Sequence, residues 1–258
     1  MTKNKDDNSP EYSTDGFLGG KINLRQPKRG FRSGHDAVLL AASVPEAARV
    51  CELGCGVGVA SLCVGARLVS AHITGIDSDA QWVALATANA ADNNMASRTN
   101  FICADIEAGF ANLNLTPNQY EEVIANPPYY KAGQSPPPPD PQKAHAMIST
   151  QDTQEAWVKC AAALLAAKGY LTMVHQPQAL PSLLAVLTPR FGDIRVLPIL
   201  PRIGSAATRI LIRAQRDSKA ALVLLPPLIL QNPDATPTPE AQAILRDGKA
   251  LAFTPTQG

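Results

Sequence analysis

The stretch Arg49-Val-Cys-Glu-Leu-Gly-Cys-Gly-Val-Gly58 decides the fold of this chain. Its first half, 49–53, is apolar enough for a buried strand, and residues 59–68 that follow have helical character. Glycines at alternate positions allow a tight turn in between, with backbone pressed against a ligand. They are Gly54, Gly56 and Gly58, and Cys55 lies in the same loop. The stretch predicts a site for a nucleotide-like ligand at the carboxyl edge of a parallel sheet.

Two details separate this loop from a dinucleotide-binding fingerprint. Val59 fills the position where a G-x-G-x-x-G pattern needs its third glycine, and the acid Glu52 precedes the glycines. Both details argue against a pyrophosphate ligand.

Acids follow the next two apolar runs. Asp77 comes after the strand-like run 72–76, and its carboxylate can accept hydrogen bonds from both hydroxyls of a ribose. A third run, 100–104, ends at Asp105. Two alternatives stay open: the glycines only close a turn, and the two acids only cap helices.

The second informative motif is Asn126-Pro-Pro-Tyr129, which follows a fourth strand-like run at 122–125. Proline fixes the backbone and removes a donor, so the Asn126 side chain and the Pro127 carbonyl point outward. An NH2 group whose lone pair is delocalised into a π-system is a poor nucleophile. Two acceptor oxygens that hold both of its protons favour a pyramidal nitrogen, and the Asn126 and Pro127 oxygens suit this task. Pro128 stiffens the turn, and Tyr129 can stack on a flat ring and align it for reaction. The alternative is a rigid turn with a core tyrosine.

The glycine loop, the ribose acid and the later acid resemble the cofactor site of class I S-adenosylmethionine-dependent methyltransferases, over roughly residues 49–198. The resemblance implies a Rossmann-like α/β fold: a seven-stranded, mostly parallel sheet with an antiparallel edge hairpin and helices on both faces. It also implies roles for the acids. Glu52 helps to bind the methionine portion with the glycines, Asp77 holds the ribose, and Asp105 faces the adenine amino group.

Within that class, the Asn-Pro-Pro-Tyr motif is typical of enzymes that methylate planar nitrogen. The segment Gln26-Pro-Lys-Arg-Gly-Phe-Arg-Ser-Gly-His-Asp-Ala-Val-Leu-Leu-Ala41 resembles bacterial tRNA adenine N6-methyltransferases. Phe17-Leu-Gly-Gly20, the strand-like 209–214 and the helix-like 239–245 fit the same family. By this resemblance Asp36 lies near the methionine end of the cofactor; an equal alternative is that Ser33 or Asp36 caps the helix that runs to about residue 42.

The resemblance implies N6 of adenosine as the target, presented by tRNA or another structured RNA from a single-stranded region. Three other functions stay open: methylation of a release-factor glutamine at N5, methylation of an amino group in ribosomal RNA or DNA, and a non-catalytic binding module. The glutamine enzymes carry a helical substrate domain before the cofactor motif, whereas about fifty residues precede Glu52 here. A binding module would normally show a damaged motif, and both motifs are intact.

Composition is consistent with one domain: the chain has 258 residues, of which 45% are hydrophobic. We expect a disordered tail at 1–15 and a single methyltransferase domain at 16–258. Within that domain we expect an N-terminal segment at 16–45, a mobile proline-rich loop at 130–147 and a C-terminal extension at 216–258. Polar residues at the start of the chain and the lack of a long apolar run predict a cytoplasmic protein without a membrane partner.

Cysteine and histidine spacings predict no metal site, and the five cysteines are expected to be reduced thiols. The net charge of +1 is low for an RNA-binding protein, but cations gather in two regions. The first holds Lys21, Arg25, Lys28, Arg29 and Arg32, and the second holds Arg195, Arg202, Arg209, Arg213, Arg216 and Lys219. Each is a candidate phosphate-contacting strip, although a solvated face is the commoner meaning of spaced arginines.

Overall fold

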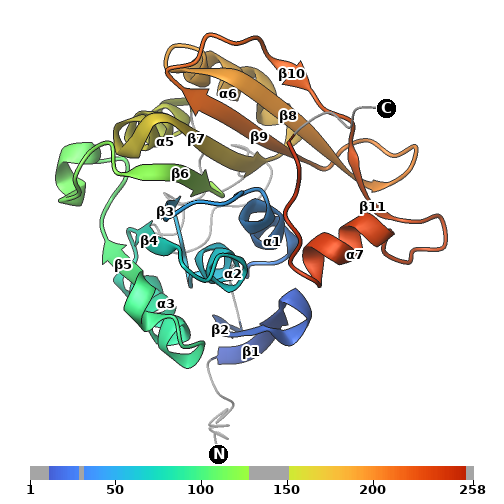
Figure 1. Ribbon diagram of the computed structural model, residues 1–258, viewed down its shortest axis with the longest axis horizontal. Helices are drawn as coiled ribbons and strands as arrows, with labels where there is room; N and C mark the ends of the chain where they lie inside the picture. Colours follow the sequence, from blue (N-terminus) through green and yellow to red (C-terminus); the bar gives the residue numbers. More distant parts are fainter. Residues whose placement is uncertain (1–11, 29–31, 128–150, 254–258) are drawn as a thin grey trace, which may run out of the picture.

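A nine-stranded sheet forms the centre of the molecule, in a computed structural model that describes residues 12–28, 32–127 and 151–253 (Figure 1). Side by side, its strands are β10 (Val223–Leu224), β8 (Phe191–Arg202), β9 (Arg209–Arg216), β7 (Leu165–His175), β6 (Tyr120–Ala125), β3 (Arg49–Leu53), β4 (His72–Asp77) and β5 (Thr99–Cys103), while β11 (Leu228–Gln231) also pairs with β8.

The five strands from β7 to β5 are parallel, and β9 is antiparallel to both β7 and β8. This arrangement confirms the predicted Rossmann-like sheet with its antiparallel edge hairpin. The strand count is higher than the predicted seven. The two extra strands, β10 and β11, lie in the predicted extension 216–258 and pair with the outer edge of β8.

Helices cover both faces of the sheet. On one face lie α1 (His35–Ala42), α2 (Val59–Arg67), α3 (Ala80–Asp92) and α7 (Pro239–Leu245); on the other lie α5 (Gln151–Leu164) and α6 (Leu180–Leu187). The short 3-10 helices are η1 (Leu18–Gly20), η2 (Ala96–Arg98), η3 (Phe110–Leu113) and η4 (Pro177–Ala179). Each face has its own buried apolar cluster, as expected when parallel strands are covered on both sides.

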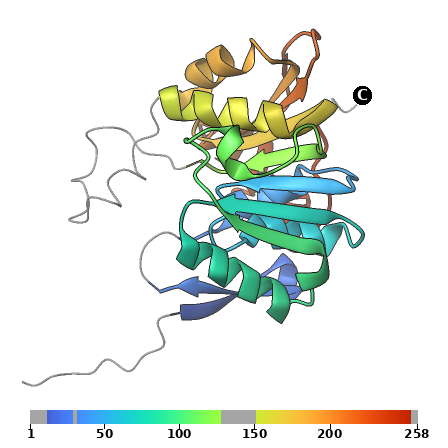
Figure 2. The ribbon, with the colours of Figure 1, turned by 90° about the vertical axis from the view of Figure 1, so that its left-hand side faces the viewer.

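An N-terminal hairpin of β1 (Tyr12–Phe17) and β2 (Ile22–Pro27) packs on the α1 face and lies below the stacked strands in Figure 2. This hairpin was not predicted from the sequence, and the predicted tail at 1–15 overlaps β1. Alternate residues of β2, Ile22 and Leu24, are buried, which is the signal that a strand leaves in a sequence.

Specific contacts set the ends of two helices. Helix α5 ends at Leu164, because Leu165 already pairs with Tyr120 in the sheet. The cap of α3 is Asp79, whose carboxylate accepts a hydrogen bond from the Gln81 N–H at 2.8 Å. The predicted loop at 130–147 lies outside the described residues. Within the described ranges, none of the helices combines the length and apolar character needed to cross a bilayer.

Candidate active site

Strand register brings the two sequence motifs to one edge of the sheet. Leu53 is aligned with Ala125 on one side and with Ile76 on the other. The residues that follow these three positions are Gly54, Asn126 and Asp77. Because parallel strands end together, the glycine loop, the candidate ribose acid and the candidate amine acceptor lie side by side at the carboxyl edge.

Backbone hydrogen bonds hold the segments at this edge of the sheet together. The Cys55 N–H donates to the Ile76 carbonyl at 2.9 Å, so the glycine loop is attached to the end of β4. The Ala104 N–H donates to the Asp77 carbonyl at 2.9 Å, which holds the segment after β5 against the same strand end. Asp105 is thereby placed one residue beyond this contact.

The glycine loop adopts the backbone conformation that its sequence predicts. Gly54, Gly56 and Gly58 have φ values of 68°, 50° and 86°. A Cβ on Gly54 would lie 2.5 Å from Cη2 of Trp157, and one on Gly58 would lie 3.2 Å from the Phe101 ring. Both positions therefore need glycine for conformation and for space. Gly58 also starts α2 without a side-chain cap, so backbone N–H groups face the loop.

Asp77 organises the loop from the end of β4. Its carboxylate accepts hydrogen bonds from the Gly56 N–H at 2.8 Å and the Asp79 N–H at 3.0 Å. Burial raises the pKa of Asp77, and the backbone hydrogen bonds oppose that rise. Since Asp79 and not Asp77 caps α3, the capping alternative for Asp77 is wrong.

Asp105 lies beyond the end of β5 and is exposed. Its carboxylate accepts a hydrogen bond from the Glu107 N–H at 2.8 Å. The next helical turn, η3, starts with Gly109 at its cap position, so Asp105 caps no helix of the described chain. The Asp105 carboxylate therefore lies at the same carboxyl edge of the sheet as Asp77.

Glu52 is buried beneath the glycine loop. One of its carboxylate oxygens accepts hydrogen bonds from the Ser61 N–H at 2.8 Å and the Ser61 hydroxyl at 2.5 Å. Burial raises the pKa of Glu52 to about 8, and the bonds from Ser61 oppose this rise. Glu52 therefore ties β3 to the first turn of α2, a function that was not predicted from the sequence.

Asp36 forms an ion pair with Arg209, with 2.7 Å between its Oδ2 and Nε of the arginine. The cap position of α1 is Gly34, and no side chain caps this helix, so the capping alternative for Ser33 and Asp36 is wrong. Arg209 is the first residue of β9, next to the carboxyl end of β7. The ion pair therefore holds the start of α1 at the same edge as the motifs.

Asn126 and Pro127 follow β6 directly; Asn126 is partly exposed and Pro127 is buried. Asn126 is placed next to Gly54 by the register of β6 with β3. The other two residues of the motif, Pro128 and Tyr129, lie outside the described residues.

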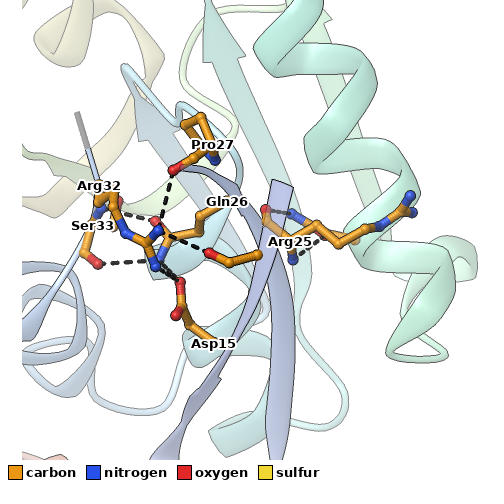
Figure 3. Close-up of polar contacts among 8 residues, drawn as sticks. Asp15, Arg25, Gln26, Pro27, Arg32 and Ser33 are labelled. Carbon is orange, nitrogen blue, oxygen red and sulfur yellow. Dashed lines mark hydrogen bonds and ion pairs between the residues drawn. The ribbon is translucent and has the colours of Figure 1, made fainter. Parts of the chain in front are cut away.

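A polar network closes the N-terminal segment onto the start of α1 (Figure 3). The Gln26 side chain is buried; its Oε1 accepts from the Ser33 N–H at 2.9 Å and its Nε2 donates to Asp15 at 2.8 Å and to the Ser33 carbonyl at 3.3 Å. Arg32 donates to Asp15 and, at 2.8 Å, to the Ser13 hydroxyl. Gln26 thus pairs with the backbone of Ser33 as a neighbouring strand would.

A second buried amide connects the hairpin to the glycine loop. Asn89 of α3 accepts from the Arg25 N–H at 2.9 Å and donates to the Arg25 carbonyl at 3.1 Å and to the Val57 carbonyl at 3.0 Å. Four residues of the site were not predicted from the sequence: Asn89, Gln26, Ser61 and Arg209. The available signal in the sequence was a polar residue at a position where the apolar pattern predicts burial. This signal does not identify the partner of the polar residue.

Two further residues lie at this edge. Trp157 of α5 packs against Gly54, and His175 is the last residue of β7. Burial lowers the pKa of His175 to about 4, so the ring is neutral near pH 7. All five cysteines are unpaired, and the described residues contain no cluster of three or more potential metal ligands.

Comparison with known proteins assigns the family. The model of the methyltransferase small domain matches residues 33–198. The chain belongs to the methyltransferase small-domain family. It is thus an S-adenosylmethionine-dependent methyltransferase.

Similar proteins share most of the chain. A tRNA1(Val) (adenine(37)-N6)-methyltransferase of Dickeya chrysanthemi is 27% identical over 93% of this chain and 96% of its own length. The protein of that name from Enterobacter sp. is 30% identical over 62% of this chain and 64% of its own. The solved structure of a predicted O-methyltransferase from Agrobacterium tumefaciens superposes with a TM-score of 0.71 and 27% identity, over 84% of this chain and 98% of its own.

The described residues of this methyltransferase fit its cofactor. No atom lies within 4 Å of the position that a Cβ on Gly56 would take, so a ligand can approach the loop backbone there, and the Asp77 carboxylate accepts from the Gly56 N–H at the end of β4. A sulfonium nucleoside needs this combination of close backbone approach, a ribose acceptor and negative charge.

Proposed function

We propose that this methyltransferase transfers the methyl group of S-adenosylmethionine to the exocyclic N6 of adenosine in tRNA. The observation that carries the proposal is the position of Asn126-Pro127 beside the glycine loop, at the end of the strand next to β3. Curated relatives that cover most of the chain bear names of tRNA adenine N6-methyltransferases, which supports the same substrate. A tRNA substrate is consistent with the cytoplasmic location that the sequence predicts.

In this proposal the cofactor lies across the ends of β3, β4 and β5. Gly54, Gly56 and Gly58 let backbone approach the methionine portion, and Asp77 accepts from the ribose hydroxyls. Asp105 faces the adenine amino group. Cys55 belongs to the same loop and contributes its backbone, because burial raises the pKa of its thiol and keeps it protonated.

Two acids govern the methionine end. Glu52 holds the first turn of α2 through Ser61 and lies beneath the loop, near the cationic end of the cofactor. Asp36, fixed by Arg209, supplies a second carboxylate from α1. Burial raises the pKa of Glu52 to about 8, and the positive charge of a bound ammonium group would lower this pKa, so that Glu52 releases its proton to solvent and becomes a carboxylate.

The target base is handled by the Asn-Pro-Pro-Tyr motif. When bound, S-adenosylmethionine supplies an electrophilic methyl group. Asn126 Oδ1 and the Pro127 carbonyl accept hydrogen bonds from the two N6 protons, which localises the nitrogen lone pair for attack. The nitrogen loses one proton to solvent after methylation. Pro128 stiffens the turn and Tyr129 stacks on the adenine, as the sequence predicts for residues outside the described ranges.

A single-stranded presentation of the adenosine belongs to the proposal, because N6 of a paired adenine is engaged with its partner base. Methylation of a release-factor glutamine uses the same acceptors on an amide and is the second candidate. The similarity to a protein described as a predicted O-methyltransferase adds oxygen as a third kind of target. Two acceptors next to each other favour nitrogen with two protons over a hydroxyl with one.

The experiment is methyl transfer from labelled S-adenosylmethionine to unmodified total tRNA, release factor and ribosomal RNA in parallel, followed by nucleoside and amino-acid analysis. The proposal expects label in N6-methyladenosine from tRNA. Label in release-factor glutamine, in another nucleoside or in a ribose oxygen would replace it with the corresponding alternative.

A further inference from the structure

The two basic strips of the sequence are not the cationic surface of the folded protein, because carboxylates neutralise most of their arginines. The ion pairs join Arg25 to Asp92, Arg32 to Asp15, Arg195 to Asp193, Arg209 to Asp36, Arg213 to Glu122 and Arg216 to Asp217. Arg213 is also buried, so it cannot reach an external phosphate. A phosphate-binding surface has to be sought among the remaining cations.

A groove of about 690 Å³ lies on the α1 face. Its walls are the hairpin at 15–20, the start of α1, the end of β8, β11 and α7. Figure 1 shows α1, α7 and the hairpin on the same side of the sheet. Apolar side chains, among them Phe17 and Leu245, line part of the groove and give it a surface on which a base can stack.

Three exposed cations from distant parts of the sequence lie in or directly beside the groove walls: Lys21, Arg202 and Arg246. The Lys21 ammonium donates to the Asp247 carbonyl at 2.8 Å, and Arg202 Nε donates to Oε1 of Gln231 in the groove wall at 3.3 Å. Among the residues that the structure describes, none of the three cations forms an ion pair. The positive charges of Lys21 and Arg202 are therefore held by neutral oxygens, and all three charges remain available to an anion.

The groove leads away from the active-site edge. One end of the groove lies at the start of α1 and at Arg202, the last residue of β8. This end is near the active-site edge, because β8 is antiparallel to β9 and therefore ends beside the start of β9. The other end lies where Arg246 contacts the hairpin turn. The two backbones are close there, because a Cβ on Gly19 would be 2.9 Å from the Arg246 carbonyl oxygen. The first turn of α1 lines the groove through His35 and Val38.

We propose that this groove, named here the α1–α7 groove, binds the sugar–phosphate backbone of the RNA strand that carries the target nucleotide. Lys21, Arg202 and Arg246 contact successive phosphates while the target base enters the site at the sheet edge. The proposal rests on the proposed RNA substrate and adds where that RNA binds. A protein of net charge +1 then attracts RNA through a local surface and not through its total charge.

The test compares two triple variants of the full chain. The groove variant carries Lys21→Gln, Arg202→Gln and Arg246→Gln. The control variant carries Lys168→Gln, Arg190→Gln and Lys219→Gln, which remove the same charge from exposed or half-exposed positions near the opposite ends of β7, β8 and β9. The measurements are binding of unmodified total tRNA at several salt concentrations, binding of S-adenosylhomocysteine, and thermal unfolding.

The groove variant is expected to bind tRNA at least tenfold more weakly than the control variant, with unchanged cofactor affinity and unfolding. Its slope of log Kobs against log salt should fall by about 2, since each phosphate contact contributes about 0.7 for a single strand. Equal tRNA affinity and slope in the two variants would overturn the groove proposal. The proposed reaction has a separate readout, because wild-type protein that binds tRNA through the groove without forming N6-methyladenosine would disprove the reaction alone.

Discussion

The cofactor edge and the α1–α7 face differ in how far apart in the sequence their contacting residues lie. The α1–α7 face is the side of the sheet that carries α1, α7 and the N-terminal hairpin. At the edge, Glu52 meets Ser61 nine residues on and Asp77 meets Gly56 over 21 residues. On the α1–α7 face, Lys21 meets Asp247 across 226 residues and Arg67 meets Gly248 across 181. Local contacts leave a motif in the sequence, whereas distant contacts leave only single residues whose partners are fixed by the fold.

If this comparison is right, the single substitution with the largest effect on stability lies at the cofactor edge, at Gly54. In Gly54→Ala the new Cβ meets Trp157 at 2.5 Å and the residue keeps a φ of 68°. We expect a loss of about 2–4 kcal/mol in the free energy of unfolding, from strain and overpacking together.

Gly56→Ala is the matched control, since its φ is 50° but no atom lies within 4 Å of the position that the new methyl group would take. Chemical denaturation should show a loss of about 1 kcal/mol there, from backbone strain alone. Equal losses in the two variants would mean that the Trp157 contact does not constrain the loop.

The next effect concerns the cofactor. Asp77→Asn keeps the shape of the side chain but turns one acceptor into a donor that faces a backbone N–H. We expect S-adenosylhomocysteine to bind about 10–100-fold more weakly, corresponding to one lost charged hydrogen bond.

Asp79→Asn provides the control, because asparagine caps a helix as well as aspartate does. Calorimetry should give wild-type affinity for this variant. Wild-type affinity for Asp77→Asn as well would remove Asp77 from the cofactor site.

The α1–α7 face offers a comparable change at Gln26. Gln26→Ala removes three hydrogen bonds of a buried amide and leaves the Ser33 N–H without its side-chain acceptor. We expect a loss of about 2 kcal/mol in stability and a lower kcat at saturating cofactor, because Ser33 leads into α1 and Asp36. Gln81→Ala, at an exposed position of α3, should change neither quantity. A stable Gln26→Ala with wild-type kcat would make the network dispensable.

Counted per pH unit, the smallest expected effect is a pH dependence at Glu52. Burial raises its pKa from 4.5 to about 8, so the folded state holds a proton that the unfolded state releases. The stability from this group is complete below pH 4.5 and is lost as the pH rises through 8, with a slope of at most about 1.4 kcal/mol per pH unit. Glu52→Gln should remove this slope in denaturation curves taken from pH 5 to pH 8.5. An unchanged difference between wild type and variant across that range would contradict the shift.

Much of the fold and of the cofactor edge could be predicted from the sequence. The strand at 49–53, the glycine loop and the acids at the ends of β4 and β5 follow from apolar runs that stop at polar residues. The hairpin β1–β2 was missed because its alternating pattern is short and follows a polar segment. The roles of Gln26, Asn89 and Arg209 were missed because their partners are far away in the sequence.

The charge pattern was the most misleading signal. Two groups of spaced cations are candidate phosphate strips in the sequence, but Arg25, Arg32 and Arg195 pair with carboxylates in the folded protein. Of these groups, Lys21 and Arg202 lie beside the groove. A sequence shows how many charges a segment carries, but not which of them the fold neutralises. Arg246, which belongs to neither predicted strip, reaches the groove because α7 packs beside the hairpin.

The central claim is that Asn126, beside the glycine loop, prepares N6 of adenosine for methylation. The most direct measurement is single-turnover methyl transfer to unmodified tRNA by wild type, Asn126→Ala and Asn100→Ala, an exposed control on β5. Cofactor binding is measured alongside. We expect N6-methyladenosine from wild type and control, and a rate at least about 100-fold lower for Asn126→Ala with cofactor affinity intact. A wild-type rate for Asn126→Ala would contradict the account.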